Sequence, residues 1–444
     1  MKGSGLIVAA VILAGLVGAL YWSNHHKPAE TTEAAADAPP KILAVKTPDI
    51  SKFDLKKDGT EQVGAERNGA GQWQITSPAA LPADQSAVSS LLGTFSSLNS
   101  QRLVEEKASN LTAYGLDAPK FEVDLTEKNN QTQSLLLRDA TPASNAIYAK
   151  LGGDPRIFTI ASYDKTSIDK SANDLRDKRL LTVNPDKISE VDLVANKQEM
   201  AFGRNKDEWQ IVKPKPLRGD AAQVDSLVRA LTDAKMELTA TDDQKKTASA
   251  FASATPVATA KVTAESGRQE LQVRKNKENY YAKSSAVEGI YKVPDTLGHA
   301  LDKNLEGFRN KKLFDLGSDD LSKIEVRDGS KTYFLTRSGE DWWSGNAKKM
   351  DAGAVQDLID KIRELSASKF VDAGFAAPAI ELIVTSNGGK KVEKVAISKA
   401  GGNYIAIREN EPATLYQLDS KAVDDLTKSA EDVKPATIAA SGHS

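Results

Sequence analysis

Two short basic clusters are the residues best suited to binding chemistry in this chain of 444 residues. One is LRDKRLL at residues 175–181, and a near copy, FRNKKLF, occupies residues 308–314. Clusters of lysine and arginine bind phosphates, nucleic acid or lipid headgroups. They can equally cap helix carbonyls and pair with acids where two folded units meet. The choice therefore lies between an anion site and a joint.

Motifs for catalysis are few. The segment SYDK, residues 162–165, matches the S-x-x-K pattern of serine acyl-enzymes, but its companion motifs do not occur, which favours a solvated turn. The sequence contains no nucleotide-binding loop, zinc-protease motif or calcium loop. Three acidic pairs favour solvated loops or helix starts, although two glycosidase carboxylates need only be close in space; they are Asp242–Asp243, Asp319–Asp320 and Asp424–Asp425. We predict no catalytic residues, no cofactor and no metal, and hence a protein that is not an enzyme.

Composition excludes several further classes of protein. The 59 basic and 61 acidic residues nearly cancel, so no overall field favours nucleic acid. The sequence has no cysteine, which excludes disulfides, thiolate metal sites and a cysteine nucleophile. Its four histidines are too few and too scattered to indicate a catalytic dyad together with a metal site.

The amino-terminal segment predicts a membrane anchor. Residues 6–22 carry no charge, and the terminal Tyr21 and Trp22 suit the interface between membrane and water. We predict a cytoplasmic tail at residues 1–5 and a single span at 6–22 in the cytoplasmic (inner) membrane of a bacterium. The bulk of the chain then lies in the periplasm or outside. A cleaved signal peptide is the alternative, because VGA at residues 17–19 resembles a cleavage site.

Three other features belong to the ends of the chain. Ala10, Ala14 and Gly18 place small residues at a spacing that lets two anchors pack, which predicts weak self-association. Residues 23–45 begin with a stretch rich in alanine, proline and acids, which predicts a flexible linker. The last residues, 433–444, are predicted to be a disordered tail.

The body of the chain contains three copies of one pattern. The stretches DISKFDL, DKISEVDL and DLSKIEV begin at residues 49, 186 and 320, and a strand with tryptophan, WQI or WWS, follows each. The copies are separated by about 135 residues, which indicates tandem repetition of a folded unit. The predicted units span residues 46–181, 182–314 and 315–432.

An aspartate follows the tryptophan in every copy and precedes a helical pattern. Apolar residues recur 4, 7, 8 and 11 positions after Asp84, Asp220 and Asp351. This spacing forms one apolar stripe of a helix, and the aspartate side chain can cap its first amides. We therefore interpret the three aspartates as helix N-caps and not as catalytic acids.

The second half of each copy alternates apolar and polar residues, as in FEVDL and AIELIV, and ends in a short helical segment. The sequence therefore predicts an α+β fold, with an N-terminal transmembrane helix followed by tandem units of mainly antiparallel sheet and a packed helix. Aromatic residues on these strands favour core packing over a surface that stacks on ligands.

The repeats allow a choice between the two interpretations of the basic clusters. Each cluster follows the last helix of a unit, and the third unit, which has no successor, lacks one. A joint explains this absence better than an anion site does. The predicted joint residues are Arg176, Asp177, Lys178, Arg179, Arg309, Lys311 and Lys312, with anion binding as the alternative.

Several motifs resemble a known family. WQITSP, PADQSAVSSLL, YGLDAP, TPASNAIYAK and LRDKRLL are similar to the bacterial domain-of-unknown-function family 4340, best over residues 50–181 and least in the third unit. The segment LLLRDATP departs from it, because a glycine turn is expected before the threonine. The family's members are membrane-anchored and often encoded beside ABC transporter genes of the gliding-motility type. The resemblance implies an integral-membrane transporter as partner and brings no catalytic residues.

Three functions follow as hypotheses. The first is a non-catalytic, single-pass envelope protein that serves as an extracytoplasmic scaffold or accessory subunit of an ABC-type transport complex. The alternative is an extracytoplasmic module that binds glycan or lipid through exposed aromatic residues. The third is an envelope hydrolase whose site has no recognisable motif.

Overall fold

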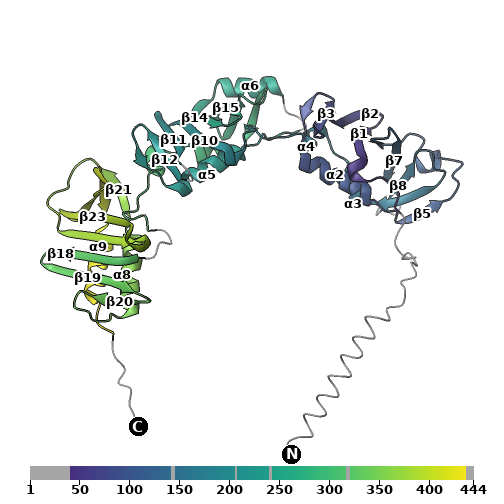
Figure 1. Ribbon diagram of the computed structural model, residues 1–444. Coiled ribbons are helices and arrows are strands. Elements are labelled where there is room, and N and C mark those ends of the chain that lie inside the picture. The colour runs from purple at the N-terminus through teal and green to yellow at the C-terminus, as the bar shows by residue number, and fades with distance from the viewer. Residues whose placement is uncertain (1–40, 142–145, 206–207, 240–242, 317–320, 437–444) are drawn as a thin grey trace, which may run out of the picture. The chain divides into compact units, whose positions relative to one another are not determined.

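The computed structural model describes residues 41–436 except 142–145, 206–207, 240–242 and 317–320 (Figure 1). The predicted tail, anchor and small-residue contact at Ala10, Ala14 and Gly18 lie outside the described residues. None of the helices in the described ranges is long and apolar enough to span a membrane. The chain divides into two compact units, of which one ends at Lys178 and the other begins at Arg179.

The first sheet has nine antiparallel strands in the order β4-β3-β2-β1-β6-β7-β8-β9-β5. Its strands are β1 Ile50–Lys57, β2 Thr60–Arg67, β3 Trp73–Ser77, β4 Leu81–Pro82, β5 Arg102–Glu105, β6 Phe121–Glu127, β7 Thr132–Ala140, β8 Ala146–Leu151 and β9 Ile157–Ala161. The helices of this part are α2 Gln85–Ser97, α3 Ser162–Ile168 and α4 Ala172–Leu175.

The second sheet has eight strands in the order β13-β12-β11-β10-β14-β15-β16-β17. They are β10 Ile188–Ala195, β11 Gln198–Asn205, β12 Glu208–Lys213, β13 Leu217–Arg218, β14 Thr255–Ala264, β15 Gly267–Asn276, β16 Asn279–Ser284 and β17 Ile290–Val293. The helices are α5 Ala221–Thr232, α6 Gln244–Ala252 and α7 Asp295–Leu301.

The third sheet also has eight strands, in the order β20-β19-β18-β22-β23-β24-β25-β21. They are β18 Leu321–Asp328, β19 Lys331–Ser338, β20 Asp341–Ser344, β21 Ala367–Val371, β22 Ile380–Ser386, β23 Lys391–Ala400, β24 Asn403–Arg408 and β25 Glu411–Leu418. The helices are α8 Ala352–Glu364 and α9 Ser420–Asp432.

The three sheets share one plan. In each, the first strand of the copy pairs antiparallel with its successor and with a long strand that follows the helix, in the pairs β1–β6, β10–β14 and β18–β22. A helix follows the last strand of each copy. This common order confirms the predicted α+β class and fits the predicted tandem repeats.

The three long helices begin as the aspartates predict, because each aspartate side chain accepts hydrogen bonds from exposed first-turn amides. The bonds run from Ser86 and Ala87 to Asp84 at 2.9 and 3.1 Å, from Gln223 to Asp220 at 3.2 Å, and from Ala354 to Asp351 at 2.9 Å. The aspartates therefore fix where α2, α5 and α8 start.

Each sheet buries its own apolar core against these helices. The apolar stripes at 4, 7, 8 and 11 residues after the aspartate are buried in all three copies. Trp73, Trp209 and Trp342 are only 3, 5 and 8 % exposed, so the repeated tryptophans are core residues. Each copy therefore has the packing of a small domain.

The boundaries of the copies differ from the predicted ones. Ile42 and Leu43 belong to the first core, so the linker predicted at 23–45 ends too late. At the other end, the Ala436 amide donates a 2.9 Å hydrogen bond to the Lys349 carbonyl, so the tail predicted at 433–444 begins too early. The backbone of both segments is hydrogen-bonded to the folded repeat, which outweighs their loop-like composition. We refer to residues 41–178, 179–311 and 312–436 as repeats 1, 2 and 3.

Two helical glycines provide a test of packing. A Cβ on Gly298, in α7, would lie 2.1 Å from the Tyr280 ring, whereas a Cβ on Gly93, in α2, would meet nothing within 4 Å. Gly298→Ala should destabilise repeat 2 by about 1–3 kcal/mol through overpacking. Gly93→Ala should instead stabilise repeat 1 by about 0.5–1 kcal/mol. Amide hydrogen exchange measures both effects locally, and equal effects of the two substitutions would contradict the described packing.

Candidate functional site

The first basic cluster begins by closing repeat 1. The backbone of Arg176, whose side chain is buried, pairs with Ala83. The Asp177 amide donates a 2.8 Å hydrogen bond to the Pro82 carbonyl. Lys178 is the last residue of the first compact unit. The first half of the cluster thus forms an isolated β-bridge beside β4, at the edge of the first sheet.

The second half of the cluster opens repeat 2. Arg179 pairs with Lys235, and the Leu180 amide bonds to the Ala234 carbonyl at 2.8 Å. Leu180 and Leu181 are buried in the second core. The residues of LRDKRLL therefore divide between two repeats, with the change between Lys178 and Arg179, and the apolar residues at either end belong to two different cores.

The second cluster repeats this arrangement. Arg309 pairs with Gly219, and the Asn310 amide bonds to the Arg218 carbonyl at 2.9 Å. The guanidinium group of Arg309 lies 3.4 Å from the centre of the Phe370 ring, at a distance typical of a cation–π contact. Burial lowers the pKa of Arg309 below its ordinary value.

The residues that follow open repeat 3. Lys312 pairs with Ser366, and the Lys311 ammonium group donates to the Ser368 carbonyl at 3.3 Å. Leu313 and Phe314 are buried in the third core. Arg309, Lys311 and Lys312 therefore contact protein groups at the end of one repeat and the start of the next.

Repeat 3 has the same closing contact without a basic cluster. Met350 pairs with Pro435, and the Asp351 amide bonds to the Lys434 carbonyl at 2.9 Å. The contact in all three repeats is made by backbone atoms, while the paired residue is arginine in two copies and proline in the third. We call residues 175–177, 308–310 and 434–436 the closing segments.

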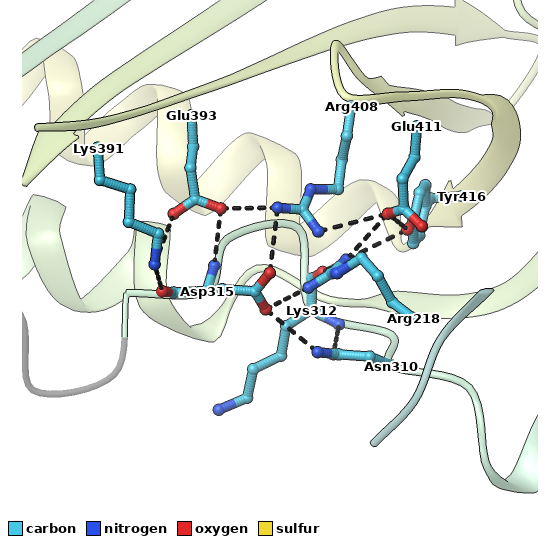
Figure 2. A network of polar contacts seen from close by, with 9 residues as sticks. All are labelled: Arg218, Asn310, Lys312, Asp315, Lys391, Glu393, Arg408, Glu411 and Tyr416. Carbon is cyan, nitrogen blue, oxygen red and sulfur yellow. Dashed lines mark hydrogen bonds and ion pairs between the residues drawn. The ribbon is translucent and has the colours of Figure 1, made fainter. Parts of the chain in front are cut away.

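A group of charged residues beside the second closing segment was not predicted from the sequence (Figure 2). Its members come from the end of β13, the opening of repeat 3, and the helix-facing side of β23, β24 and β25. We call it the ion cluster, and it consists of Arg218, Asp315, Lys391, Glu393, Arg408, Glu411 and Tyr416.

Arg408 is the most deeply buried member. Its side chain is 2 % exposed and its Nη2 atom lies 2.6 Å from Oε1 of Glu393, which is itself only 6 % exposed. The same nitrogen lies 3.2 Å from the Asp315 carboxylate, and Nη1 lies 3.4 Å from Glu411. Burial is tolerated here because the guanidinium group is surrounded by carboxylates.

Arg218 reaches the same carboxylates from repeat 2. It forms an ion pair with Asp315 and lies 3.4 Å from Oε2 of Glu411. Its Nη1 atom donates to the Lys312 carbonyl at 2.9 Å and to the Tyr416 hydroxyl at 3.2 Å. Tyr416 in turn donates to Glu411 at 2.8 Å. One side chain of repeat 2 thus contacts several groups of repeat 3.

The remaining contacts fix the position of Asp315. Its amide donates to Oε1 of Glu393 at 3.1 Å, and Nδ2 of Asn310 donates to its carboxylate at 3.1 Å. Lys391 donates to the Asp315 carbonyl and lies 3.7 Å from Oε2 of Glu393. Asp315 is therefore held by both its backbone and its side chain.

The electrostatics of the ion cluster favour the charged forms. Burial works against ionisation of Asp315, but Arg218 and Arg408 outweigh it and hold the pKa of this carboxyl below its ordinary value. Burial likewise disfavours the charge of Arg218, yet Asp315 and Tyr416 raise the pKa of Arg218 overall. Burial and the neighbouring Glu411 raise the pKa of Tyr416, so the phenol stays protonated and can donate.

The charged members of the ion cluster line a cleft of about 760 Å³. Trp209, Ile211 and Pro216 of repeat 2 also line this cleft. The charged groups that line it are bonded to one another, so the arrangement can hold two repeats together. Within the described ranges, no group of three or more histidine, aspartate and glutamate residues could hold a metal ion.

The pH dependence of this contact follows from Asp315. Because its pKa is lowered on folding, its contribution to stability is complete above its unfolded pKa of about 3.9 and is lost as the pH falls through the folded value. Asp315→Asn should therefore destabilise the protein more at pH 6 than at pH 3. Urea unfolding of both proteins at the two pH values measures the effect, and an equal difference at both would contradict it.

A comparison of the repeats shows what signal in the sequence could have identified the ion cluster. In each repeat, the residue directly after the two buried apolar residues that open it, at 42–43, 180–181 and 313–314, donates its amide to a side-chain oxygen on a central strand. The pairs are Ala44 to Gln133 at 3.3 Å, Thr182 to Gln269 at 2.9 Å and Asp315 to Glu393 at 3.1 Å. Repeat 3 has glutamate where the other two repeats have glutamine, and aspartate where they have alanine or threonine. These two acidic residues are the signal in the sequence that distinguishes repeat 3.

The other motifs with possible chemistry contribute no residue to the ion cluster. Residues 162–165 belong to α3, so the solvated turn predicted for SYDK is wrong, because burial of Ile168 stabilises a helix here. Asp243 caps α6. Asp425 pairs with Lys421 at 2.6 Å within α9. Asp242 and the pair at 319–320 lie outside the described residues.

Comparisons with known proteins identify the family. The sequence matches the family described as "Domain of unknown function (DUF4340)" over residues 73–208 and again over 209–382. No curated protein and no solved structure matches the chain. Since the two matches lie in tandem and together span more than half of the sequence, the chain belongs to the DUF4340 family.

Proposed function

We propose that this protein is a non-catalytic, single-pass membrane-anchored envelope protein that serves as an extracytoplasmic scaffold or accessory subunit of an ABC-type transport complex. The observation that supports this most is the ion cluster, because its charged groups bond to each other across repeats 2 and 3. Charged groups that bond to one another across two repeats are better suited to a scaffold than to the turnover of a substrate.

The sequence supports the location. The uncharged residues 6–22 would anchor the chain in the cytoplasmic membrane of a bacterium, and the three repeats would extend into the periplasm or outside. The resemblance to membrane-anchored relatives encoded beside ABC transporter genes supports an integral-membrane transporter as the partner.

The alternative, a module that binds glycan or lipid, requires aromatic rings at the surface. The repeated tryptophans are buried, and the large hydrophobic residues exposed in the described ranges include two aromatic ones, Tyr163 and Phe334. They belong to different repeats, on α3 and β19, so among the described residues of its own repeat neither has a second large exposed aromatic ring with which to form a stacking platform. The scaffold is therefore the better supported function.

Cross-linking in native membranes tests the proposal. The tagged full-length protein should capture the permease or ATPase subunits of an ABC transporter. A matched control replaces residues 6–22 by an unrelated transmembrane segment, which keeps the tether and should still capture them if the repeats make the contact. Recovery of no transporter subunit would contradict the proposal. A rise in melting temperature with cell-wall fragments or anionic lipid vesicles would instead favour the binding module.

A further inference from the structure

The ion cluster is not balanced in charge by repeat 3 alone. Among the described residues, repeat 3 contributes three carboxylates to it, those of Asp315, Glu393 and Glu411. It contributes two cations, Lys391 and Arg408. One negative charge is left over in a partly buried site, where an unpaired charge is costly.

Arg218 of repeat 2 provides the third cation. Its side chain is 17 % exposed and lies within ion-pair distance of Asp315 and Glu411 (Figure 2). Arg309, the other nearby cation of repeat 2, stacks on Phe370 instead. Arg218 is thus the counter-ion that closes the balance of the ion cluster.

Equivalent positions in the other repeats lack this chemistry. Arg218, Pro82 and Lys349 correspond, because the carbonyl of each accepts the backbone hydrogen bond from its closing segment, at 2.9, 2.8 and 2.9 Å. Pro82 has no cation to offer, and Lys349 forms an ion pair with Asp341 of its own repeat at 2.9 Å. The acidic acceptors of repeat 3 likewise stand where repeat 2 has Thr182 and Gln269.

We propose that Arg218 is a coupling residue, a counter-ion that repeat 2 contributes to the carboxylates of repeat 3 in the ion cluster. The two repeats then unfold cooperatively, as one body. The same contact makes repeat 3 specific for repeat 2 as its neighbour. Removal of Arg218 leaves Arg408 as the cation that Asp315 and Glu411 share. The strands that carry Glu411 and Arg408 should then open more often, although the substitution lies in the other repeat. This role is independent of the partner that the protein binds.

Hydrogen exchange of the full-length protein tests the coupling. Arg218→Met should speed the exchange of amides in β24 and β25 by about tenfold or more, as expected for loss of hydrogen bonds to charged groups. The matched control is Arg268→Met, which removes an arginine bonded to Asp192 within repeat 2. It should leave the exchange of repeat 3 unchanged.

Charge rescue separates coupling from ordinary packing. The double variant Arg218→Met, Glu411→Gln restores the balance and should recover much of the protection, and Arg218→Lys, which keeps the charge, should lose less than Arg218→Met. The proposal is overturned if Arg218→Met leaves β24 and β25 as protected as in the wild type. It is also overturned if Glu411→Gln restores nothing, since the loss would then come from packing. If Arg218→Met does not fold, amide exchange in β24 and β25 is compared between Arg218→Lys and the wild type. Equal protection of these strands in the two proteins would then overturn the proposal.

Discussion

Arg408→Met should destabilise repeat 3 by about 3–5 kcal/mol, because removing one partner of a buried ion pair leaves the other charge without compensation. Glu393 would lose a 2.6 Å contact while its side chain stays only 6 % exposed. Hydrogen exchange of β23 and β24 should accelerate by more than about a hundredfold. The control is Lys394→Met, which removes an exposed partner 3.0 Å from Glu409 and should cost less than about 1 kcal/mol.

A second substitution should rescue much of this loss. The first repeat places Gln133 where repeat 3 has Glu393, and on the adjacent strand it places Leu151 where repeat 3 has Arg408. Arg408→Leu combined with Glu393→Gln copies that pair. Buried ion pairs replaced by packed neutral residues are often close to neutral in stability. If the double variant were as unstable as Arg408→Met, an unpaired carboxylate would not be the cause of the loss.

Phe308→Ala should destabilise repeat 2 by about 3–5 kcal/mol, the usual cost of emptying a buried phenylalanine site. The side chain is 0 % exposed, and its ring centre lies 4.8 Å from that of Phe202 in an edge-to-face contact. Exchange of β11 amides, monitored in the full-length protein, measures the effect. Phe334→Ala removes a ring that is 40 % exposed on β19 and serves as the control, with an expected change below about 1 kcal/mol. Equal costs for both would contradict the assignment of Phe308 to the core.

The local features of the fold could be predicted from the sequence. Asp84, Asp220 and Asp351 precede regular apolar stripes, and both the cap and the stripe depend on residues a few positions apart. The alternating strands and the repetition follow for the same reason. The antiparallel sheets then result from burying these stripes against the strands.

The ion cluster could not be predicted in the same way. Arg218 and Glu411 are separated by 193 residues, and their contact depends on how the end of β13 meets the start of β25. No spacing rule connects them. The sequence likewise predicts a linker at residues 42 and 43, because the stretch rich in alanine, proline and acids before them is the stronger local signal. The core that contains these two residues is formed by strands far away in the sequence.

The closing segments have a consequence for how such a protein can evolve. Because the contact is made by main-chain atoms, arginine and proline both occupy the paired position, and gene duplication can append another copy without a new side chain to secure its edge. The number of repeats can therefore change independently of the contacts between neighbouring repeats. Such contacts need only a few substitutions, such as those at 218, 315 and 393. The surfaces with which neighbouring repeats contact each other can then diverge while the fold of each repeat stays the same.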